Sequence, residues 1–146
     1  MNGFENVYFR GKFRDYQQRV LDNAGKYLDD GKINIVAAPG SGKTVLGLEL
    51  IRRIGAPCII LSPSTAIREQ WGQRFKELFL DDEARFDALY SNDLHKVRFL
   101  NSVTYQALYT SIEKISSDNV EDADCSDVDL FETMRAFGIK TVCLDE

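Results

Sequence analysis

The chain has 146 residues, 44% of them hydrophobic and 28% charged, a composition typical of one soluble globular domain with its own core. It contains no apolar run of roughly 18 residues and no signal-peptide pattern, which excludes a membrane-spanning class and predicts a cytoplasmic location. Its net charge of −5 excludes a uniformly basic nucleic-acid binder, but residues 1–76 hold 12 Lys/Arg against 7 Asp/Glu, and residues 77–146 hold 6 against 16.

The first part of the chain predicts an amphipathic helix. Apolar side chains recur at helical spacing from Tyr16 to Leu28. Asp15 with Gln18 three residues later resembles a capping box, and Gly31 suits the end of the helix. We therefore expect one helix to precede the first strand.

Short apolar runs then alternate with helical patterns. Buried strands are predicted over residues 33–37 and 58–62, with a helix from about Gly42 between them. The next helix is predicted from about Thr65 to Leu80. One stripe on that helix is expected to face the core, and it consists of Ile67, Trp71, Phe75, Leu78 and Phe79.

The second half of the chain continues the alternation with weaker signals. Strands are predicted over 86–90 and 97–103, helices over 104–112 and 129–137, and a last strand over 140–146. Strands that are apolar on both faces and alternate with helices indicate a mainly parallel sheet covered by helices. The predicted fold class is therefore α/β.

An acidic segment over residues 113–132 interrupts this pattern. Its low apolar content and clustered carboxylates cannot offset the entropy cost of ordering, so we expect a mobile acidic loop there, with a solvated insertion as the simplest interpretation. Cys58, Cys125 and Cys143 show no CxxC spacing, and His95 stands in a polar stretch typical of a solvated loop. These residues predict no metal or redox centre.

The octet "AAPGSGKT" at residues 37–44 connects a predicted strand to a predicted helix. Backbone N–H groups are available at the start of a helix, and a glycine-rich turn lets phosphate oxygens approach them without side-chain collision. The octet matches a P-loop with Ala37 in place of the usual first glycine. It predicts a nucleotide site formed by Pro39, Gly40, Ser41, Gly42, Lys43 and Thr44.

The predicted chemistry needs Lys43 and Thr44 of this octet and two acidic residues at the end of the chain. We expect Lys43 to bind the outer phosphates and the Thr44 hydroxyl to ligate magnesium. The run "KTVCLDE" places Asp145 and Glu146 at the end of a buried strand. Asp145 would hold magnesium through water, and Glu146 would orient and activate the attacking water. Lys43 and Glu146 are the predicted catalytic residues.

Four motifs in this order resemble the first half of DEAD/DEAH-box type helicases and translocases of superfamily two. "APGSGKT" is similar to motif I, "PSTAIREQ" (63–70) to motif Ia, "VTYQAL" (103–108) to motif Ib and "DE" to the start of motif II. The resemblance extends from about Phe13 to Glu146. It implies an incomplete RecA-like P-loop NTPase lobe that uses ATP and Mg²⁺ and binds nucleic acid, with DNA favoured over RNA.

The resemblance also implies binding roles for individual residues. Gln17 in "FRDYQ" corresponds to a glutamine that reads adenine, although an exposed polar residue in a first helical turn is the alternative. Ser64 and Thr65 begin one helix, and Thr104 and Gln106 lie in "VTYQ"; all four are expected to contact a nucleic-acid backbone. Capping and turn roles remain the alternatives for them.

The motifs divide the chain into four parts. Residues 1–31 form the adenine-side segment and helix, 32–112 hold motifs I, Ia and Ib, 113–132 form the acidic insertion, and 133–146 hold a helix end and the motif II strand. The motifs and their spacing resemble the branch of type III restriction motor subunits and XPB-like or UvsW-like translocases.

The sequence departs from the family pattern after motif II. In the family, a motif III strand lies between the strands of motifs I and II, and a second lobe supplies an arginine to the transferred phosphoryl group. We therefore expect a nearly inactive fragment with a gap in its sheet, which strand exchange or dimerisation would fill. The expected function is the ATP-binding portion of a nucleic-acid-dependent ATPase. A non-catalytic binding module and a small P-loop NTPase or kinase remain the alternatives.

Overall fold

The computed structural model describes residues 3–28, 34–36, 38, 40–116 and 132–145. These residues form a four-stranded, all-parallel sheet in the order β2-β3-β1-β4. The predicted α/β class with a parallel sheet is therefore confirmed, and the arrangement matches a partial RecA-like fold. The strands are β1 (Cys58–Ser62), β2 (Tyr90–Ser91), β3 (Leu100–Thr104) and β4 (Thr141–Leu144).

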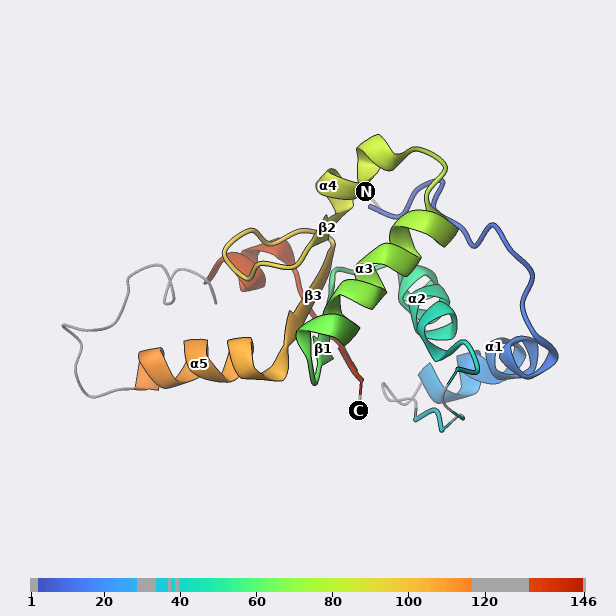
Figure 1. Cartoon of the computed structure of the whole chain (residues 1–146), viewed down its shortest axis with the longest axis horizontal. Helices are drawn as coiled ribbons and strands as arrows, with labels where there is room; N and C mark the ends of the chain where they lie inside the picture. Colours follow the sequence, from blue (N-terminus) through green and yellow to red (C-terminus); the bar gives the residue numbers. More distant parts are fainter. Residues whose placement is uncertain (1–2, 29–33, 37, 39, 117–131, 146) are drawn as a thin grey trace.

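Helices cover both faces of the sheet (Figure 1). α2 and α3 pack on one face, α5 and the helical residues 132–137 pack on the other, and α1 lies outside α2. A short η1 and α4 lead into β2. The helices are α1 (Asp15–Leu28), α2 (Lys43–Ile54), α3 (Thr65–Phe79), η1 (Glu83–Arg85), α4 (Phe86–Leu89) and α5 (Tyr105–Ser116).

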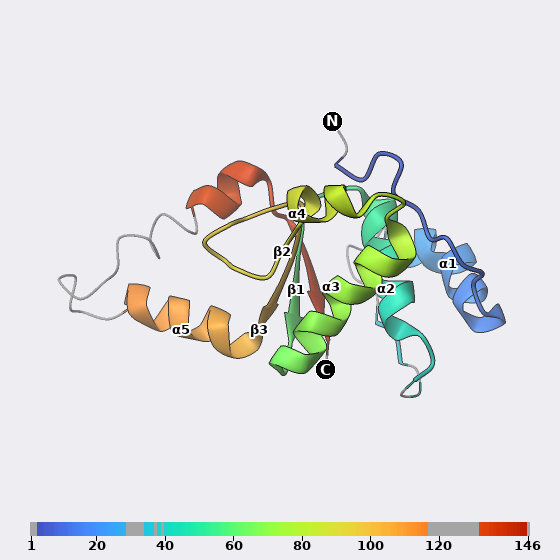
Figure 2. The ribbon, with the colours of Figure 1, turned by 45° about the horizontal axis from the view of Figure 1, so that its top comes forward.

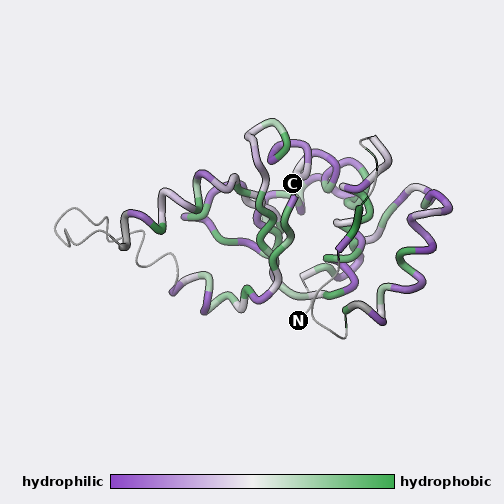
Figure 3. The backbone as a smooth tube through the Cα atoms, turned by 90° about the horizontal axis from the view of Figure 1, so that it is seen from below, coloured by the Kyte–Doolittle hydropathy of each residue, from purple (hydrophilic) through white to green (hydrophobic). Residues whose placement is uncertain are grey.

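The side chains of β1 alternate between two apolar cores. Cys58 and Ile60 pack toward α2 and α3, whereas Ile59 and Leu61 pack toward α5 and the opposite face. All four are buried, as expected for a strand that neighbours pair on both sides. Figure 3 shows hydrophobic segments gathered along the strands. The predicted stripe on α3 is confirmed, with Trp71, Phe75 and Phe79 buried and Ile67 and Leu78 partly buried.

The segment before α1 belongs to the same core. Phe4 and Val7 are buried, and the Phe4 ring packs edge-on against Phe75 of α3, with 6.3 Å between the ring centroids. The backbone N–H of Arg10 donates to the carbonyl of Leu78 at 2.8 Å. These contacts place the segment across the end of α3.

Two of the weaker strand predictions need correction. The strand predicted over 86–90 is wrong, because residues 86–89 form α4 and β2 begins only at Tyr90. The Asp82 carboxylate accepts the N–H of Ala84 at 2.9 Å and so starts η1, which continues into α4. The strand predicted over 97–103 is present as β3 but begins at residue 100.

The strand predicted over 33–37 is also wrong for its described residues, 34–36, which have no strand structure. Val36 is 96% exposed, whereas Ile35 packs against the cluster between α1 and α2. A strand gains its ladder hydrogen bonds only beside another strand. Within the described sheet β4 is an edge strand, and residues 34–36 do not pair with it.

The predicted capping box of α1 is wrong in its residues. The helix begins at Asp15, so the reciprocal position three residues after the cap is Gln17. The Gln17 Oε1 accepts the backbone N–H of Arg14 at 2.8 Å. Gln18 instead donates its amide to Asp22 at 2.8 Å.

Some of the predicted features lie outside the residues that the structure describes. Most of the predicted acidic loop, residues 117–131, lies outside the described residues, as does Cys125. Over the described ranges, no group of three His, Cys, Asp or Glu side chains could hold a metal ion. No helix in the described part of the chain is long and apolar enough to cross a membrane. The division into four parts stays a prediction.

Glu49 is a buried carboxylate on α2, and its ion pairs predict a pH-dependent contribution to stability. Arg52 and Arg53 each donate to its Oε1, at 2.6 and 2.9 Å. Burial opposes the charged form, but these hydrogen bonds and charges outweigh it and lower the pKa of Glu49. A lowered pKa stabilises the fold above the unfolded pKa, and this stabilisation disappears as the pH falls through the native pKa.

Glu49→Gln should therefore reduce the free energy of unfolding at pH 7 by about 1 kcal/mol, because water partly screens the two arginines. Urea unfolding at a series of pH values would show the difference shrinking below about pH 4. Glu77→Gln is the matched control, since Glu77 is exposed and accepts a hydrogen bond from the neutral amide of Gln73. A difference that persists unchanged at acidic pH would contradict the assignment.

Candidate functional site

The glycine-rich turn before α2 has the backbone geometry of an anion site. Gly40 and Gly42 have φ of 76° and 89°, left-handed values that glycine adopts at little cost. No side chain caps the start of α2, so the N–H groups of its first turn remain available. Lys43 is the first residue of α2 and is exposed, and Thr44 follows, partly buried.

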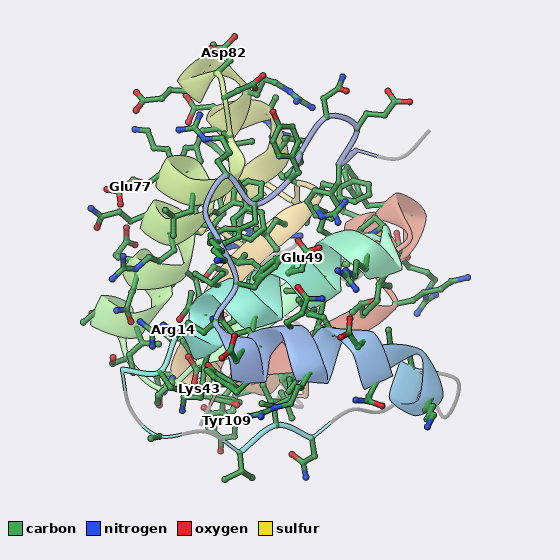
Figure 4. All side chains as sticks on the ribbon, turned by 90° about the vertical axis from the view of Figure 1, so that its right-hand side faces the viewer. Arg14, Lys43, Glu49, Glu77, Asp82 and Tyr109 are labelled. Atoms are coloured by element: carbon green, nitrogen blue, oxygen red, sulfur yellow. The ribbon has the colours of Figure 1, made fainter. Side chains whose placement is uncertain are left out.

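Residues at and just before the start of α1 bind the glycine-rich turn. Three consecutive carbonyls, those of residues 40–42, accept hydrogen bonds from Arg14, Tyr16 and Gln17 in that order. The Arg14 bond measures 3.3 Å and the Gln17 bond 2.9 Å. Figure 4 shows α1 beside this region, with Arg14 and Lys43 labelled. Arg14 and Tyr16 lie in the stretch "FRDYQ", but no sequence signal distinguished them as contacts of the glycine turn.

Gln17 lies against the turn with its amide already engaged. The residue is 3% exposed, its Oε1 accepts from Arg14 and its Nε2 donates to the Gly42 carbonyl. Recognition of adenine through both amide atoms would require Gln17 to exchange these bonds. Its assignment as the adenine-reading residue stays a prediction.

The described donors fit a phosphate group. Ser41 Oγ is buried without a hydrogen-bond partner among the described residues. A buried hydroxyl in that state is costly, and a phosphate oxygen would give it a partner. The Lys43 ammonium and the uncapped N–H groups of α2 add further donors at the same turn. Pro39 lies outside the described residues.

Asp145 follows β4 and is fixed from two sides. Its backbone N–H donates to the Leu61 carbonyl of β1 at 2.9 Å, and its Oδ2 accepts the indole N–H of Trp71 at 2.9 Å. The Asp145 carboxylate remains partly exposed, and carboxylate oxygens are ligands that Mg²⁺ prefers. The pairing of Asp145 with the Thr44 hydroxyl at one metal ion stays a prediction. Glu146 lies outside the described residues.

Cys143, two residues before Asp145, and Cys58, at the opposite end of β1 from the Asp145 contact, are both held as neutral thiols. Burial, with the charge of Asp145 as a second cause, raises the pKa of Cys143 to about 11. Burial also raises the pKa of Cys58 well above its ordinary range. A reactive cysteine needs the thiolate form, so neither residue is suited to act as a nucleophile at neutral pH.

Two of the predicted nucleic-acid residues cap helices at the carboxyl edge of the sheet. Ser64 Oγ accepts the N–H of Ile67 at 3.3 Å at the start of α3. Thr104 Oγ1 accepts the N–H of Ala107 at 3.1 Å at the start of α5. Figure 2 shows β1, β3 and β4 ending at this edge, where α3 and α5 begin.

The remaining candidates at this edge differ in exposure. Thr65 and Gln106 are exposed, and Gln106 donates to Thr110 at 3.4 Å. Ser62, which is not one of the four predicted residues, ends β1 at the same edge; it is fully buried, and its Oγ has no partner among the described residues. The capping alternative therefore applies to Ser64 and Thr104, and nucleic-acid contact stays a prediction for all four residues named from the sequence.

The sequence around this site matches a known protein family. The family described as "Type III restriction enzyme, res subunit" (ResIII) matches residues 10–132, well over half of the chain. The chain belongs to the ResIII family. The match covers the first turn of α1, the glycine turn and the starts of α3 and α5. The resemblance to superfamily two helicases is confirmed.

Several relatives of this ResIII chain are named as putative helicases. The chain is 33% identical over 76 residues to UvrABC system protein B of Leptospira biflexa, 39% over 62 residues to the putative DNA 3′-5′ helicase Rad25 of Haloarcula marismortui, and 37% over 59 residues to putative helicase 055L of frog virus 3. These alignments cover 51%, 42% and 40% of this chain. They cover only 11%, 10% and 14% of the relatives.

The two glycines of the turn predict unequal effects of substitution. A Cβ at Gly42 would lie 2.5 Å from Nε2 of Gln17, whereas a Cβ at Gly40 would meet no atom within 4 Å. Both alanine variants would bear left-handed strain, but Gly42→Ala would also displace the Gln17 amide. Gly42→Ala should lower the free energy of unfolding by about 1 kcal/mol more than Gly40→Ala.

Denaturant unfolding of both single variants, and of each combined with Gln17→Ala, would test this contact. We expect the extra cost of Gly42→Ala to disappear in the Gln17→Ala background. Equal costs for the two glycine variants in the native background would contradict the close approach of α1 to the turn.

Proposed function

We propose that this ResIII chain is the ATP-binding portion of a nucleic-acid-dependent ATPase, a helicase or translocase that acts on DNA. The observation that carries the proposal is the glycine turn that opens α2. It combines left-handed glycines, an uncapped helix start and a Ser41 hydroxyl that has no hydrogen-bond partner among the described residues. The family match supports ATP use, and the relatives named as helicases support a motor role.

In the proposed site each residue has a separate task. Lys43 binds the outer phosphates, and the N–H groups after Gly42 bind phosphate oxygens. Thr44 and Asp145 hold Mg²⁺, directly and through water respectively. When bound, Mg²⁺ offsets negative charge on the phosphates. Glu146 orients the attacking water, and Gln17 contacts the base.

We propose that the nucleic-acid-binding surface lies at the carboxyl edge of the sheet. Ser64 and Thr65 at the start of α3, and Thr104 and Gln106 at the start of α5, would contact phosphates without reading bases. Neighbouring helix starts provide N–H groups for such contacts. DNA is proposed because two relatives are named putative DNA 3′-5′ helicases. Fluorescence anisotropy with labelled single-stranded DNA and RNA of one sequence would test the preference for DNA.

Calorimetric titration of the chain with ATP, in Mg²⁺ and in EDTA, tests the nucleotide site. We expect saturable binding that is tighter in Mg²⁺. Little ATP hydrolysis is expected from these 146 residues, with or without DNA, because the family resemblance assigns the stabilising arginine to a second lobe. An absence of saturable ATP binding by folded protein would overturn the proposal, and appreciable DNA-stimulated turnover would overturn the expected inactivity.

We also propose that the outer edge of β4 pairs with a strand of a second copy. β4 is an edge strand of the described sheet, and Val142 and Leu144 on it are 57% and 60% exposed. Unpaired strand edges are templates for association. Sedimentation analysis should show dimers at micromolar concentrations, and Val142→Lys should shift them toward monomers. A stable, compact monomer at all concentrations would argue against pairing.

A further inference from the structure

Trp71 occupies an unusual position between the two halves of the proposed site. It is the only tryptophan in the sequence, lies within α3 and is 3% exposed. Its indole N–H donates to the Asp145 carboxylate at 2.9 Å, a contact between residues 74 positions apart in the chain. A hydrogen bond to a carboxylate is stronger than one between neutral groups, so it restricts the orientation of Asp145.

The opposite edge of the same indole packs on α2. A Cβ at Gly47 would lie 2.7 Å from Trp71 Cη2 and 3.1 Å from Cζ3, so only glycine allows this approach. Gly47 lies about one helical turn after Lys43 and Thr44. One rigid ring therefore bridges the helix that follows the glycine turn and the carboxylate that follows β4.

We propose that Trp71 is a positioning residue for the metal-binding carboxylate. Its N–H holds Oδ2 of Asp145, while its ring fixes the spacing between Asp145 and the start of α2. This inference rests on the proposed function, because it takes Asp145 as a magnesium ligand. It adds a residue of α3, the helix whose first residues are proposed to contact nucleic acid, to the metal site. Ligand-orienting partners of this kind commonly change metal affinity by about 10- to 100-fold.

The single indole allows a direct spectroscopic test on the whole chain. The ¹H–¹⁵N spectrum should contain one indole cross-peak, and we expect Asp145→Asn to move it because the acceptor loses its charge. In chain loaded with ATP, adding Mg²⁺ should move the same cross-peak saturably. An indole signal that responds neither to Asp145→Asn nor to Mg²⁺ would overturn the proposal.

Trp71→Phe separates the hydrogen bond from the packing, because phenylalanine retains a ring but has no N–H. We expect the Mg²⁺ concentration for half-maximal ATP binding to rise by about 10-fold, with ATP affinity in EDTA unchanged. Phe75→Leu is the control, since it alters a buried ring on the same helix whose ring contacts are with Phe4, Phe79 and Phe86. It should leave the Mg²⁺ requirement unchanged.

The outcomes distinguish this inference from the proposed function. If native chain binds ATP with Mg²⁺ dependence and Trp71→Phe does not change that dependence, the role of Trp71 is refuted and the nucleotide site stands. If the folded native chain does not bind ATP, both are refuted. If Trp71→Phe fails to fold, the response of the native indole signal still decides the matter.

Discussion

Lys43→Ala is expected to weaken ATP binding by about 10- to 100-fold, the loss that follows removal of a charged hydrogen-bond donor from a phosphate. Lys43 opens α2 directly after the left-handed Gly42. An ammonium at this place adds its charge to the N–H groups of an uncapped helix start. Calorimetric titration with ATP in Mg²⁺ would measure the loss.

The same substitution should leave the fold intact. Lys43 is exposed, and among the described contacts its side chain has no ion pair or hydrogen bond. The melting temperature should therefore be nearly unchanged. Lys140→Ala is a suitable control, since this exposed lysine precedes β4 and lies at the opposite end of that strand from Asp145. Equal ATP affinity of the Lys43→Ala variant and the native chain would remove Lys43 from the phosphate site.

Ile60→Ala is expected to have the largest effect on stability, a loss of about 2–5 kcal/mol. Ile60 is fully buried at the middle of β1, between β3 and β4, and packs toward α2 and α3. Truncation would leave a cavity that the flanking strands cannot close. Since whole domains are stable by only about 5–15 kcal/mol, the variant should be close to unfolding at room temperature.

Urea unfolding would measure this loss against Val142→Ala on the neighbouring strand. Val142 is 57% exposed, so its truncation should cost less than about 1 kcal/mol. β1 also anchors Asp145 through the Leu61 carbonyl. Ile60→Ala should thus weaken the Mg²⁺ dependence of ATP binding where the variant remains folded. Similar losses for the two variants would contradict the placement of β1 at the sheet centre.

The sequence predicted an element correctly where its local residue pattern agrees with its burial in the fold. β1 is apolar from Cys58 to Leu61 and is buried on both faces, and the stripe of α3 has the period of a helix with one buried face, so both were predicted correctly. The glycine turn was also located from sequence, because left-handed backbone at residues 40 and 42 requires glycine.

Sequence pattern failed where a distant partner decides the structure. The apolar run at 33–37 has a strand pattern, but strand formation depends on an adjacent strand that periodicity cannot reveal. Residues 86–90 follow a short-range cap at Asp82 that outweighs their strand propensity. The bond from Trp71 to Asp145 was missed because it joins residues 74 positions apart, and the core stripe alone explained Trp71.

The placement of Phe4 and Val7 affects how this domain should be delimited. Both side chains are buried against the aromatic cluster at α3, yet the family match begins only at residue 10. Trimming the polypeptide to the matched region would strip two apolar side chains from that cluster and leave aromatic surface open to water. The trimmed protein should be less soluble and more prone to aggregate. The N-terminal boundary of the folded domain therefore lies before residue 10, where the family match begins.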